Sequence, residues 1–315
     1  MTHSEKIKVV FLATPDIALK TFEFFIKSPD YELLALVTQC AKAQNRGKKV
    51  VMRNITKLAM ENSIPIFEPE KISQDIETIQ KLKALKPDFF VTFAFGQILS
   101  QEVINIPKFA TINLHASLLP KYRGANPISQ VIQDGCTKTG ITTMKTALEL
   151  DAGDICLQKE IDITSEMNVV ELMQKISDLS PSLLDETLKG LYDGSLKIIP
   201  QDHSKATFTK KIKKEDKLID WSMEAISLHN KIRAMYQINT NHTMFRGKII
   251  KILKTRVLEG SAKIATIQNI TKEGILVGTS KGLIELIKVK PEGKGEMNAS
   301  DWARGARVKI GDCFE

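Results

Sequence analysis

Four short apolar runs in the first 115 residues, with helical sequence between them, constrain the fold of this chain more than any other feature. The runs cover residues 7–14, 33–39, 88–93 and 110–115, and each is predicted to be a buried strand. A Pro-Asp pair at residues 15–16 favours a helix directly after the first run, because proline suits a first helical turn and an aspartate complements the amide dipole there. Apolar strands that alternate with helices are typical of an open, mostly parallel α/β sheet.

The middle of the chain continues with strands and then a long helix. Residues 140–163 predict two strands around a loop at residues 147–153, and residues 168–194 predict a helix that bends near Pro181.

A change of character after residue 194 indicates a second domain. Residues 195–209 are polar and irregular and are interpreted as a linker. A helix is expected at residues 223–235, and short strands split by glycines follow between residues 244 and 289. Short strands with glycine-bearing turns favour a small β-barrel. We therefore expect domains at residues 1–194 and 210–315.

Composition argues against several classes of protein. No apolar run approaches the ~18 residues that a membrane helix needs, and the longest early run is too short for a signal-peptide core, so a cytoplasmic protein that avoids membranes is expected. The four cysteines form no CxxC pair. A zinc site or a disulfide framework is therefore not expected.

The positive charge lies in the last third of the chain. Residues 205–315 hold 22 Lys and Arg against 12 Asp and Glu, whereas residues 1–204 hold 23 against 25. A basic domain attached to a near-neutral one indicates either a polyanionic partner or simply a solubilising surface. Charge alone leaves both interpretations open.

The segment NLHASLLPKYRGANP, residues 113–127, contains the candidate reaction site. Side chains two apart on a strand point to one face, so Asn113 and His115 are expected in one cleft at a strand end, where open parallel sheets bind ligands. An amide donates an N–H to an oxyanion, and an imidazole exchanges protons near neutral pH. Asp151 and Asp154 are two candidates for the charge that orients the imidazole.

Each of these residues also has a purely structural interpretation. Asn113 can satisfy backbone groups at a strand end, and His115 can be a hydrogen-bonded turn residue. Asp154 can form a turn through an Asx-type bond. Spacing alone does not decide between the two interpretations.

Longer motifs resemble one known family. The run INLHASLLPKYRGANPI, with ITTM and LDAGDI behind it, resembles the folate-dependent formyltransferases. Further segments are similar to the methionyl-tRNA formyltransferases among them: FLATPDIA at 11–18, RGKK at 46–49, PDFFVTFAFGQIL at 87–99, IDWS at 219–222, IRA at 232–234 and VKPEGKGEMNASDWARGAR near the end. The resemblance covers nearly the whole chain. Several formyltransferases share the central motif, whereas the tail segments are specific to the tRNA enzymes.

The resemblance implies a fold and a reaction. The fold would be a Rossmann-like, mostly parallel α/β formyltransferase domain, followed by an OB-like small β-barrel domain that binds tRNA. The formyl donor would be 10-formyltetrahydrofolate, and the acceptor would be the α-amino group of methionine on the initiator tRNA. The product, N-formylmethionyl-tRNA, serves translation initiation. No metal or covalent enzyme intermediate is implied, and a monomer is expected.

The resemblance also assigns roles to residues. Asn113, His115 and Asp151 match the catalytic trio of the family. Asn113 and His115 would stabilise a developing oxyanion, while Asp151 would hold the histidine tautomer, favour its charged form and accept the proton of the amine, directly or through water. The residues of the folate site would be Ser117, Leu118, Leu119 and Pro120 in the turn and Phe95, Gly96, Ile98 and Leu99 in the pocket wall. Backbone groups near residues 148–151 would contact the pterin edge.

Two basic segments would contact tRNA. They are the loop with Arg46, Lys48 and Lys49 and the lead into the basic domain with Lys210, Lys211, Lys213 and Lys214. Lys121 and Arg123 beside the active turn would neutralise a terminal phosphate or the folate glutamate tail. The alternatives are a solvated charged loop for residues 46–49 and plain core packing for residues 95–99.

The chain departs from the family pattern at several places. Ala13 stands at a usual glycine, residues 40–45 replace a proline-rich acidic stretch, and VVMRN follows RGKK in place of a serine-proline stretch. Glu149 stands where glycine is common, and MYQINTNHT replaces a segment usually richer in proline and tryptophan. None of these departures touches the proposed trio.

Two rival interpretations remain. The same fold can formylate a sugar-nucleotide amine or glycinamide ribonucleotide, or hydrolyse formyl-folate, although the basic tail argues against these. The other rival is an RNA-binding protein with a decayed catalytic domain, against which the intact Asn113, His115 and Asp151 argue.

Overall fold

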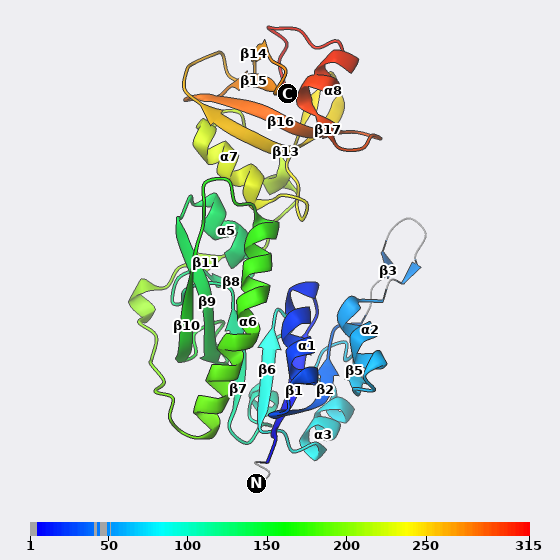
Figure 1. The fold of residues 1–315 in the computed structure, drawn as a ribbon, viewed down its shortest axis with the longest axis vertical. Coiled ribbons are helices and arrows are strands. Elements are labelled where there is room, and N and C mark those ends of the chain that lie inside the picture. The colour runs from blue at the N-terminus through cyan, green and yellow to red at the C-terminus, as the bar shows by residue number, and fades with distance from the viewer. Residues whose placement is uncertain (1–4, 41–42, 45–48, 51) are drawn as a thin grey trace. The chain divides into compact units, whose positions relative to one another are not determined.

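The structure is a computed structural model that describes residues 5–40, 43–44, 49–50 and 52–315 (Figure 1). The chain divides into two compact units, each assembled from three segments. The first unit consists of Met1–Gly124, Thr139–Ile161 and Met173–Phe208, and the second consists of Ala125–Lys138, Asp162–Leu172 and Thr209–Glu315.

The first unit is built on a seven-stranded sheet within the described residues. In spatial order the strands are β10 (Ile155–Asp162), β9 (Lys138–Lys145), β7 (Ala110–His115), β6 (Phe89–Phe93), β1 (Ile7–Ala13), β2 (Tyr31–Val37) and β5 (Ile66–Phe67). The pairs from β7 to β5 are parallel, while β7 and β9 are antiparallel. The mostly parallel sheet expected from the apolar runs is confirmed, and the run at residues 110–115 coincides with β7.

Continuous apolar sequence marks the central strands because helices and connecting segments cover them. Each of the five residues of β6 is buried, and Phe11 of β1 packs its ring against Phe22 and Phe25 of α1 (Leu19–Lys27) at centroid separations of 5.7 and 5.8 Å. A strand buried on both faces reads as an unbroken hydrophobic run.

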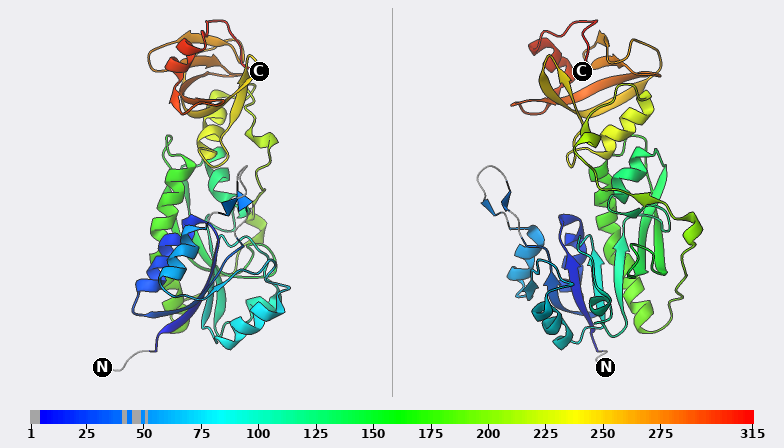
Figure 2. Two further views of the ribbon diagram at one scale, coloured as in Figure 1. Left: turned by 90° about the vertical axis from the view of Figure 1, so that its right-hand side faces the viewer. Right: turned by 180° about the vertical axis from the view of Figure 1, so that it is seen from behind.

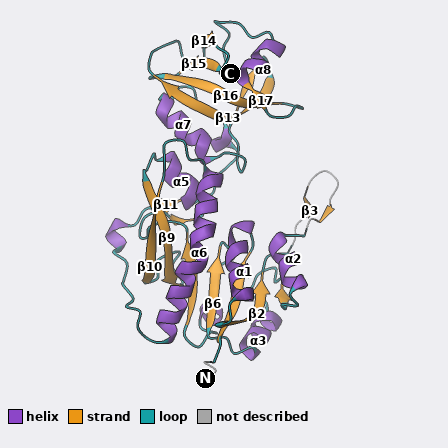
Figure 3. Ribbon diagram, viewed as in Figure 1, coloured by secondary structure: helices purple, strands orange, loops and turns teal. Residues whose placement is uncertain are grey.

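The longer helices of the first unit lie on the faces of the sheet (Figure 3). The helical elements of this unit within the described residues are the 3₁₀ turn η1 (Asp16–Ala18), α1, α2 (Asn54–Glu61), α3 (Ile76–Ala84), α4 (Gln101–Ile104), most of α6 (Val169–Tyr192) and the 3₁₀ turn η2 (His203–Lys205). The short pairs β3 (Ala43–Gln44) with β4 (Lys49–Val50) and β8 (Arg123–Gly124) with β11 (Phe208–Thr209) complete the element list for this part of the chain. The predicted long helix exists and contains Pro181.

Two of these helices lie side by side on one face of the sheet (Figure 1). The Ser177 hydroxyl of α6 donates to the carbonyl oxygen of Ile17 at 2.9 Å, and Lys20 of α1 pairs with Asp178. These contacts join α6 to the segment that begins α1. The carboxyl ends of the strands are followed by loops.

The order of the strands reverses at β1. The chain lays β2 and β5 on one side of β1 and then returns to lay β6 and β7 on its other side. In doubly wound sheets the crevice at such a switch, outside the carboxyl ends of the strands, is where ligands bind. Residues that follow β6 and the last residues of β7 lie at that edge.

The second unit contains an antiparallel sheet that curls (Figure 2). Its strands are β12 (His242–Phe245), β13 (Lys248–Leu258), β16 (Leu283–Pro291), β15 (Ile275–Gly278) and β14 (Ile267–Ile270), with β17 (Met297–Asn298) on β16. Its helices are α5 (Pro127–Gln133), the 3₁₀ turn η3 (Glu215–Lys217), α7 (Ala225–Ala234) and α8 (Ala299–Gly305). This architecture is consistent with the expected small β-barrel.

An aromatic cluster lies in the core of this unit. Trp221 stacks on Phe314 with ring centroids 5.0 Å apart, and Trp302 of α8 meets Phe245 edge-on. The sequence analysis did not predict α5 or α8, because each has only seven residues and therefore shows less than two full turns of periodicity.

Two segments from the first 194 residues belong to this second unit. Arg233 of α7 donates to the carbonyl oxygens of Thr164 and Met167, and His229 contacts the carbonyl oxygen of Ser165 at 3.2 Å. The helix α7 therefore packs against sequence that lies 64 to 69 residues earlier in the chain.

Candidate active site

Asn113, His115 and Asp151 meet at the carboxyl end of β7. The Nδ1 atom of His115 lies 3.6 Å from Oδ2 of Asp151, and Nδ2 of Asn113 lies 3.5 Å from Oδ1 of the same carboxylate. These distances are longer than strong hydrogen bonds, so the contacts are loose. The His115 and Asp151 side chains are only 7% and 10% exposed. Asp154, the other candidate, is exposed, so the geometry favours Asp151.

A threonine that the sequence analysis missed orients the Asn113 amide. Thr92 of β6 is the ladder partner of Asn113, and its hydroxyl donates to Oδ1 of that residue at 2.8 Å. Because Oδ1 is held by a donor, Nδ2 points toward the carboxylate of Asp151. A single hydroxyl in the apolar run FFVTF, opposite an asparagine in the next strand, was the available signal.

Both ring nitrogens of His115 face oxygen atoms. The Nε2 atom donates to the carbonyl oxygen of Tyr122 at 2.9 Å, while Nδ1 faces Asp151. The same carboxylate accepts the backbone N–H of Gly124 at 2.7 Å. In this conformation the ring can donate to a ligand through Nε2 only when the Tyr122 carbonyl gives up its contact.

The turn that carries Asp151 has an unusual backbone. Asp151 has a φ of +51°, in the left-handed region where aspartate is one of the tolerated residues. Two residues later, a Cβ built on Gly153 would lie 1.7 Å from the carbonyl oxygen of Lys145. The motif LDAGD therefore requires glycine at its fourth position to bring Asp151 toward β7.

The turn after β7 is held by buried side chains. Thr142 of β9 donates to the carbonyl oxygen of Ser117 at 2.6 Å and accepts the backbone N–H of Leu119 at 3.2 Å. Gln158 of β10 donates to the carbonyl oxygen of Leu119 at 2.9 Å. Ser117 is fully buried, whereas Leu118 and Pro120 are partly exposed. The partly exposed side chains are thus the ones that a ligand can reach.

The segment after β6 combines core and surface residues. Phe95 and Leu99 are 4% and 8% exposed and belong to a core cluster with residues of β1 and β2, whereas Ile98 is 83% exposed. Gly96 has a φ of +78°, and a Cβ there would lie 2.6 Å from Nε2 of Gln39. Phe95 and Leu99 are therefore core residues, whereas the Ile98 side chain is accessible to a ligand.

The basic residues fall into three groups. Arg46 and Lys48 lie outside the described residues, and the side chain of Lys49 is also outside them. The four lysines that lead into the second unit are all exposed: Lys210, Lys211, Lys213 and Lys214. The expectation that Arg123 meets a phosphate or the folate tail is wrong, because Arg123 is 1% exposed and donates to Gln201 and His203 within the protein.

Other chemistries find little support in the described part of the chain. No group of three or more His, Cys, Asp and Glu residues there is arranged to hold a metal ion. Burial raises the pKa of Cys156 to about 11, which keeps that thiol protonated at neutral pH. Within the same residues, no helix is both long enough and apolar enough to span a bilayer.

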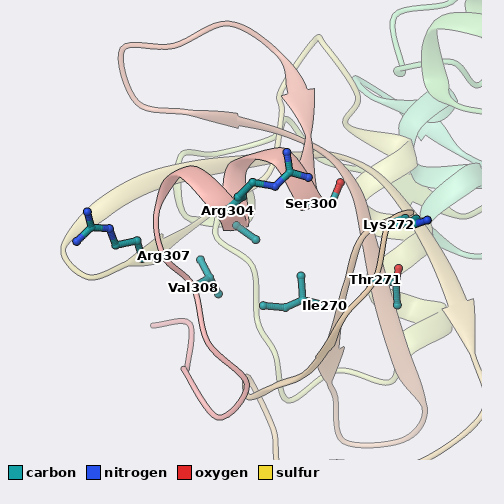
Figure 4. Close-up of a pocket in the computed structure, with 8 residues that line it drawn as sticks. Ile270, Thr271, Lys272, Ser300, Arg304, Arg307 and Val308 are labelled. Atoms are coloured by element: carbon teal, nitrogen blue, oxygen red, sulfur yellow. The ribbon is translucent and has the colours of Figure 1, made fainter.

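The second unit contains a hollow of about 420 Å³ (Figure 4). It is lined by Ile270, Thr271, Lys272, Ser300, Ala303, Arg304, Arg307 and Val308. Figure 4 shows Arg304, Arg307 and Lys272 at the edge of the hollow, with Ile270 and Val308 between them and the charged ends of Arg307 and Lys272 directed outward. Its lining suits an anionic group beside an apolar surface. Asn113, His115 and Asp151 belong to the first unit.

Comparison with known protein families gives two matches that together span most of the chain. A formyl transferase model matches residues 7–188, and a model of the formyl transferase C-terminal domain matches residues 211–307. A methionyl-tRNA formyltransferase from Sulfurihydrogenibium sp. (strain YO3AOP1) is 37% identical over 312 residues, which is 98% of this chain and 100% of the relative. A methionyl-tRNA formyltransferase from Clostridium acetobutylicum is 38% identical over 97% of this chain and 98% of its own.

Solved structures share the fold at lower identity. An N-formyltransferase from Helicobacter canadensis, in complex with folinic acid and dTDP-3-aminofucose, matches with a TM-score of 0.66 at 16% identity and covers 89% of this chain and 98% of its own. HypX from Aquifex aeolicus, in complex with tetrahydrofolic acid, matches with a TM-score of 0.64 at 15% identity over 97% of this chain. The chain spans about half of HypX, 48% of its length. From the two family matches and the near full-length relatives, the chain belongs to the formyl transferase family.

Proposed function

We propose that this protein transfers the formyl group of 10-formyltetrahydrofolate to the α-amino group of methionine on the initiator tRNA. The relatives named methionyl-tRNA formyltransferase extend along nearly the whole chain, which favours this acceptor. The observation that carries the proposal is the meeting of Asn113, His115 and Asp151 at the switch edge of the sheet.

Asn113 is the donor best placed for the oxyanion. When the amine nitrogen attacks the formyl carbon, a carbon–nitrogen bond forms and negative charge develops on the formyl oxygen. The Nδ2–H of Asn113 is directed by Thr92 and has only a 3.5 Å contact to Asp151, so a substrate oxygen can replace that contact. One well-aimed donor typically contributes about 3 kcal/mol to stabilising such a transition state.

Asp151 is the proton acceptor of the reaction, and His115 is a second donor to the oxyanion. The attacking amine must lose a proton, and the bond from the formyl carbon to N10 of the folate must break with a proton delivered to that nitrogen. Asp151 accepts the amine proton, directly or through water, and this same proton then passes to N10 of the folate, which leaves the carboxylate ionised again. Before the reaction that carboxylate orients His115. The Nε2–H of His115 donates to the carbonyl oxygen of Tyr122 in this structure. When that hydrogen bond breaks, the same N–H donates to the substrate oxygen and stabilises its negative charge. Catalytic hydrogen bonds commonly tighten only in the complex with substrate.

The folate would lie between two segments at this edge. The partly exposed Leu118 and Pro120 form one wall, and Gly96 with the exposed Ile98 forms the other. Ser117, Leu119, Phe95 and Leu99 support these walls from the buried side. Backbone groups of residues 148–151 would meet the polar edge of the pterin.

The tRNA would be bound by the basic part of the chain. We propose a catalytic domain at residues 1–194, a linker at 195–209 and a tRNA-binding domain at 210–315, in a monomeric cytoplasmic enzyme. The exposed Lys210, Lys211, Lys213 and Lys214 and the cationic hollow of the second unit supply phosphate contacts, which position RNA without reading its sequence. Arg46, Lys48 and Lys49 are proposed to add contacts at the acceptor stem.

One assay separates this function from its rivals. Purified protein is mixed with 10-formyltetrahydrofolate and one acceptor at a time: methionyl initiator tRNA, methionyl elongator tRNA, a sugar-nucleotide amine or glycinamide ribonucleotide. The formylated acceptor, free formate and bound tRNA are quantified in each reaction. Transfer to the initiator alone is expected. Transfer to a sugar-nucleotide amine or to glycinamide ribonucleotide, release of free formate, or tRNA binding without transfer would each contradict the proposal in favour of one named rival.

A further inference from the structure

Residues 199–207, within the segment predicted to be a linker, are hydrogen-bonded at both ends to strands and turns of the first unit. Ile199 exchanges two backbone hydrogen bonds with Ile155 of β10, at 2.8 and 2.9 Å. Farther along, the carbonyl oxygen of Thr207 accepts the backbone N–H of Arg123 at 2.8 Å, and the Thr207 hydroxyl accepts the N–H of Tyr122 at 2.8 Å. Residues 199–207 therefore form a strap with fixed ends.

A glutamine in the middle of this strap holds the turn of Asp151. Gln201 is 5% exposed, and its Nε2 atom donates to the carbonyl oxygen of Asp151 at 2.9 Å and to that of Gly153 at 2.6 Å. The first carbonyl belongs to the left-handed residue itself, and the second belongs to the glycine two residues later. Left-handed conformations of non-glycine residues persist when surrounding contacts over-determine them, and Gln201 supplies two such contacts.

A buried arginine fixes the orientation of that glutamine. Oε1 of Gln201 accepts from Nε and Nη2 of Arg123 at 3.2 and 2.7 Å, and Nη2 also contacts Nδ1 of His203 at 3.1 Å. With a guanidinium on its oxygen and two carbonyls on its nitrogen, the Gln201 amide has one possible orientation. The Arg123 side chain is 1% exposed, so a ligand does not compete for it.

These bonds close a ring around the carboxylate that faces His115. Arg123 holds Gln201 and Gln201 holds the backbone of Asp151. The Asp151 carboxylate in turn accepts the backbone N–H of Gly124, the residue directly after Arg123. The backbone and the side chain of Asp151 are thus tied to neighbouring points of one strand, β8. A rigid frame of this kind sets the direction of a catalytic group more tightly than its own rotamers do.

We infer that Gln201, oriented by Arg123, is a positioning residue of the reaction, which acts by holding Asp151 in its left-handed conformation against His115. The inference rests on the proposed function, because it assigns a role to the partners of a proposed catalytic carboxylate. Neither residue touches the reacting atoms. Misplacing a catalytic group by about 1 Å costs on the order of 100-fold in rate. Loss of a partner that orients a metal-bound ligand typically costs about 10- to 100-fold, and we expect a loss of similar size for the partner of a catalytic carboxylate.

Three variants separate positioning from plain stability. Gln201→Ala removes the whole amide. Gln201→Glu keeps an acceptor for Arg123 but replaces the two donors at the Asp151 and Gly153 carbonyls with an oxygen that repels them. Ser177→Ala is the matched control, because Ser177 is 6% exposed and its removal deletes a buried hydrogen bond to the Ile17 carbonyl, away from the proposed trio.

The kinetic test is a double-mutant cycle with Asp151→Asn. We expect each Gln201 variant to lower kcat by about 10- to 100-fold in the wild-type background and by less than about threefold in the Asp151→Asn background. Ser177→Ala should change kcat by less than about twofold in both backgrounds. Equal losses in the two backgrounds, or a Gln201 loss no larger than that of the control, would overturn the inference.

The NMR resonances of the His115 ring report its contact with Asp151 and can be measured without any catalytic turnover. The ring ¹⁵N resonances of His115, assigned with a His115→Gln variant, should shift in both Gln201 variants and stay unchanged in Ser177→Ala. Unchanged His115 resonances in a folded Gln201 variant would overturn the inference even if the wild type formylates tRNA. If the wild type fails to formylate initiator tRNA, the proposed function falls, and these resonances still decide whether Gln201 positions Asp151 against His115.

Discussion

Replacing Asn113 by alanine should remove most of the chemistry and little of the fold. The side chain makes two described contacts: it accepts the Thr92 hydroxyl at 2.8 Å and approaches Asp151 loosely at 3.5 Å. Thr92 keeps a possible acceptor in the carbonyl oxygen of Ile112 at 3.5 Å. The stability loss should therefore be near that of one ordinary hydrogen bond, about 1 kcal/mol.

The kinetic loss should be larger. If Nδ2 of Asn113 donates to the oxyanion, its removal costs about 3 kcal/mol of transition-state stabilisation, or on the order of 100-fold in kcat. An interaction made only in the transition state lowers kcat and kcat/KM equally, so KM for both substrates should change little. A Thr92→Val variant should give a much smaller loss of about twofold, because removing the ~1 kcal/mol preference for one amide orientation leaves the two orientations about equally populated.

The assay is steady-state transfer of labelled formyl to methionyl initiator tRNA at saturating concentrations of both substrates, with thermal unfolding as the check on stability. A kcat within about threefold of wild type for a folded Asn113→Ala protein would refute the assignment of the oxyanion donor. A kcat loss in Thr92→Val as large as that in Asn113→Ala would refute the argument that the hydroxyl acts only through the amide.

Three further predictions concern the turn, the basic segment and pH. Gly153→Ala should lower kcat at least about tenfold in steady-state assays, because its Cβ would collide with the Lys145 carbonyl and move the turn; unchanged turnover would contradict this. Replacing Lys210 and Lys211 by glutamine should flatten the dependence of log KM for tRNA on log salt by up to about one unit per lost phosphate contact and leave KM for formyl-folate unchanged; an unaltered slope would count against these contacts. Burial lowers the pKa of His229 below its usual value, so the unfolded state binds more protons and stability should fall as pH drops below about 6.5. Chemical unfolding between pH 7.5 and 5.5 should show a weaker decline for His229→Gln, and equal declines would refute this.

Much of the sheet was predictable because the burial of a strand is visible in its own short stretch of sequence. The strands β1 and β6 are almost wholly buried and therefore appear as nearly continuous apolar runs in the sequence. The spacing of Asn113 and His115 on a strand end was also sufficient to place both near one ligand edge. Asp151 needed the family resemblance, because a turn with two aspartates offers no local reason to choose one.

The supporting residues of the site were not predictable from patterns of this kind. Thr92 acts through its register with Asn113 in the neighbouring strand, which only the folded sheet reveals. Gln201 lies in a polar, irregular segment that was interpreted as a linker, and nothing in its local sequence indicates that it is buried. Arg123 was expected to meet a terminal phosphate or the folate tail because it lies beside the active turn, but it is buried against Gln201 and His203, about 80 positions later in the chain.

The most direct test of the central claim is a crystal structure of the protein with the stable donor analogue 5-formyltetrahydrofolate bound. The account predicts the pterin between the turn at Leu118–Pro120 and the segment that follows β6, with its formyl group next to the Nδ2 atom of Asn113 and within reach of His115 and Asp151. A folate bound elsewhere, or a formyl group directed away from these three side chains, would contradict it.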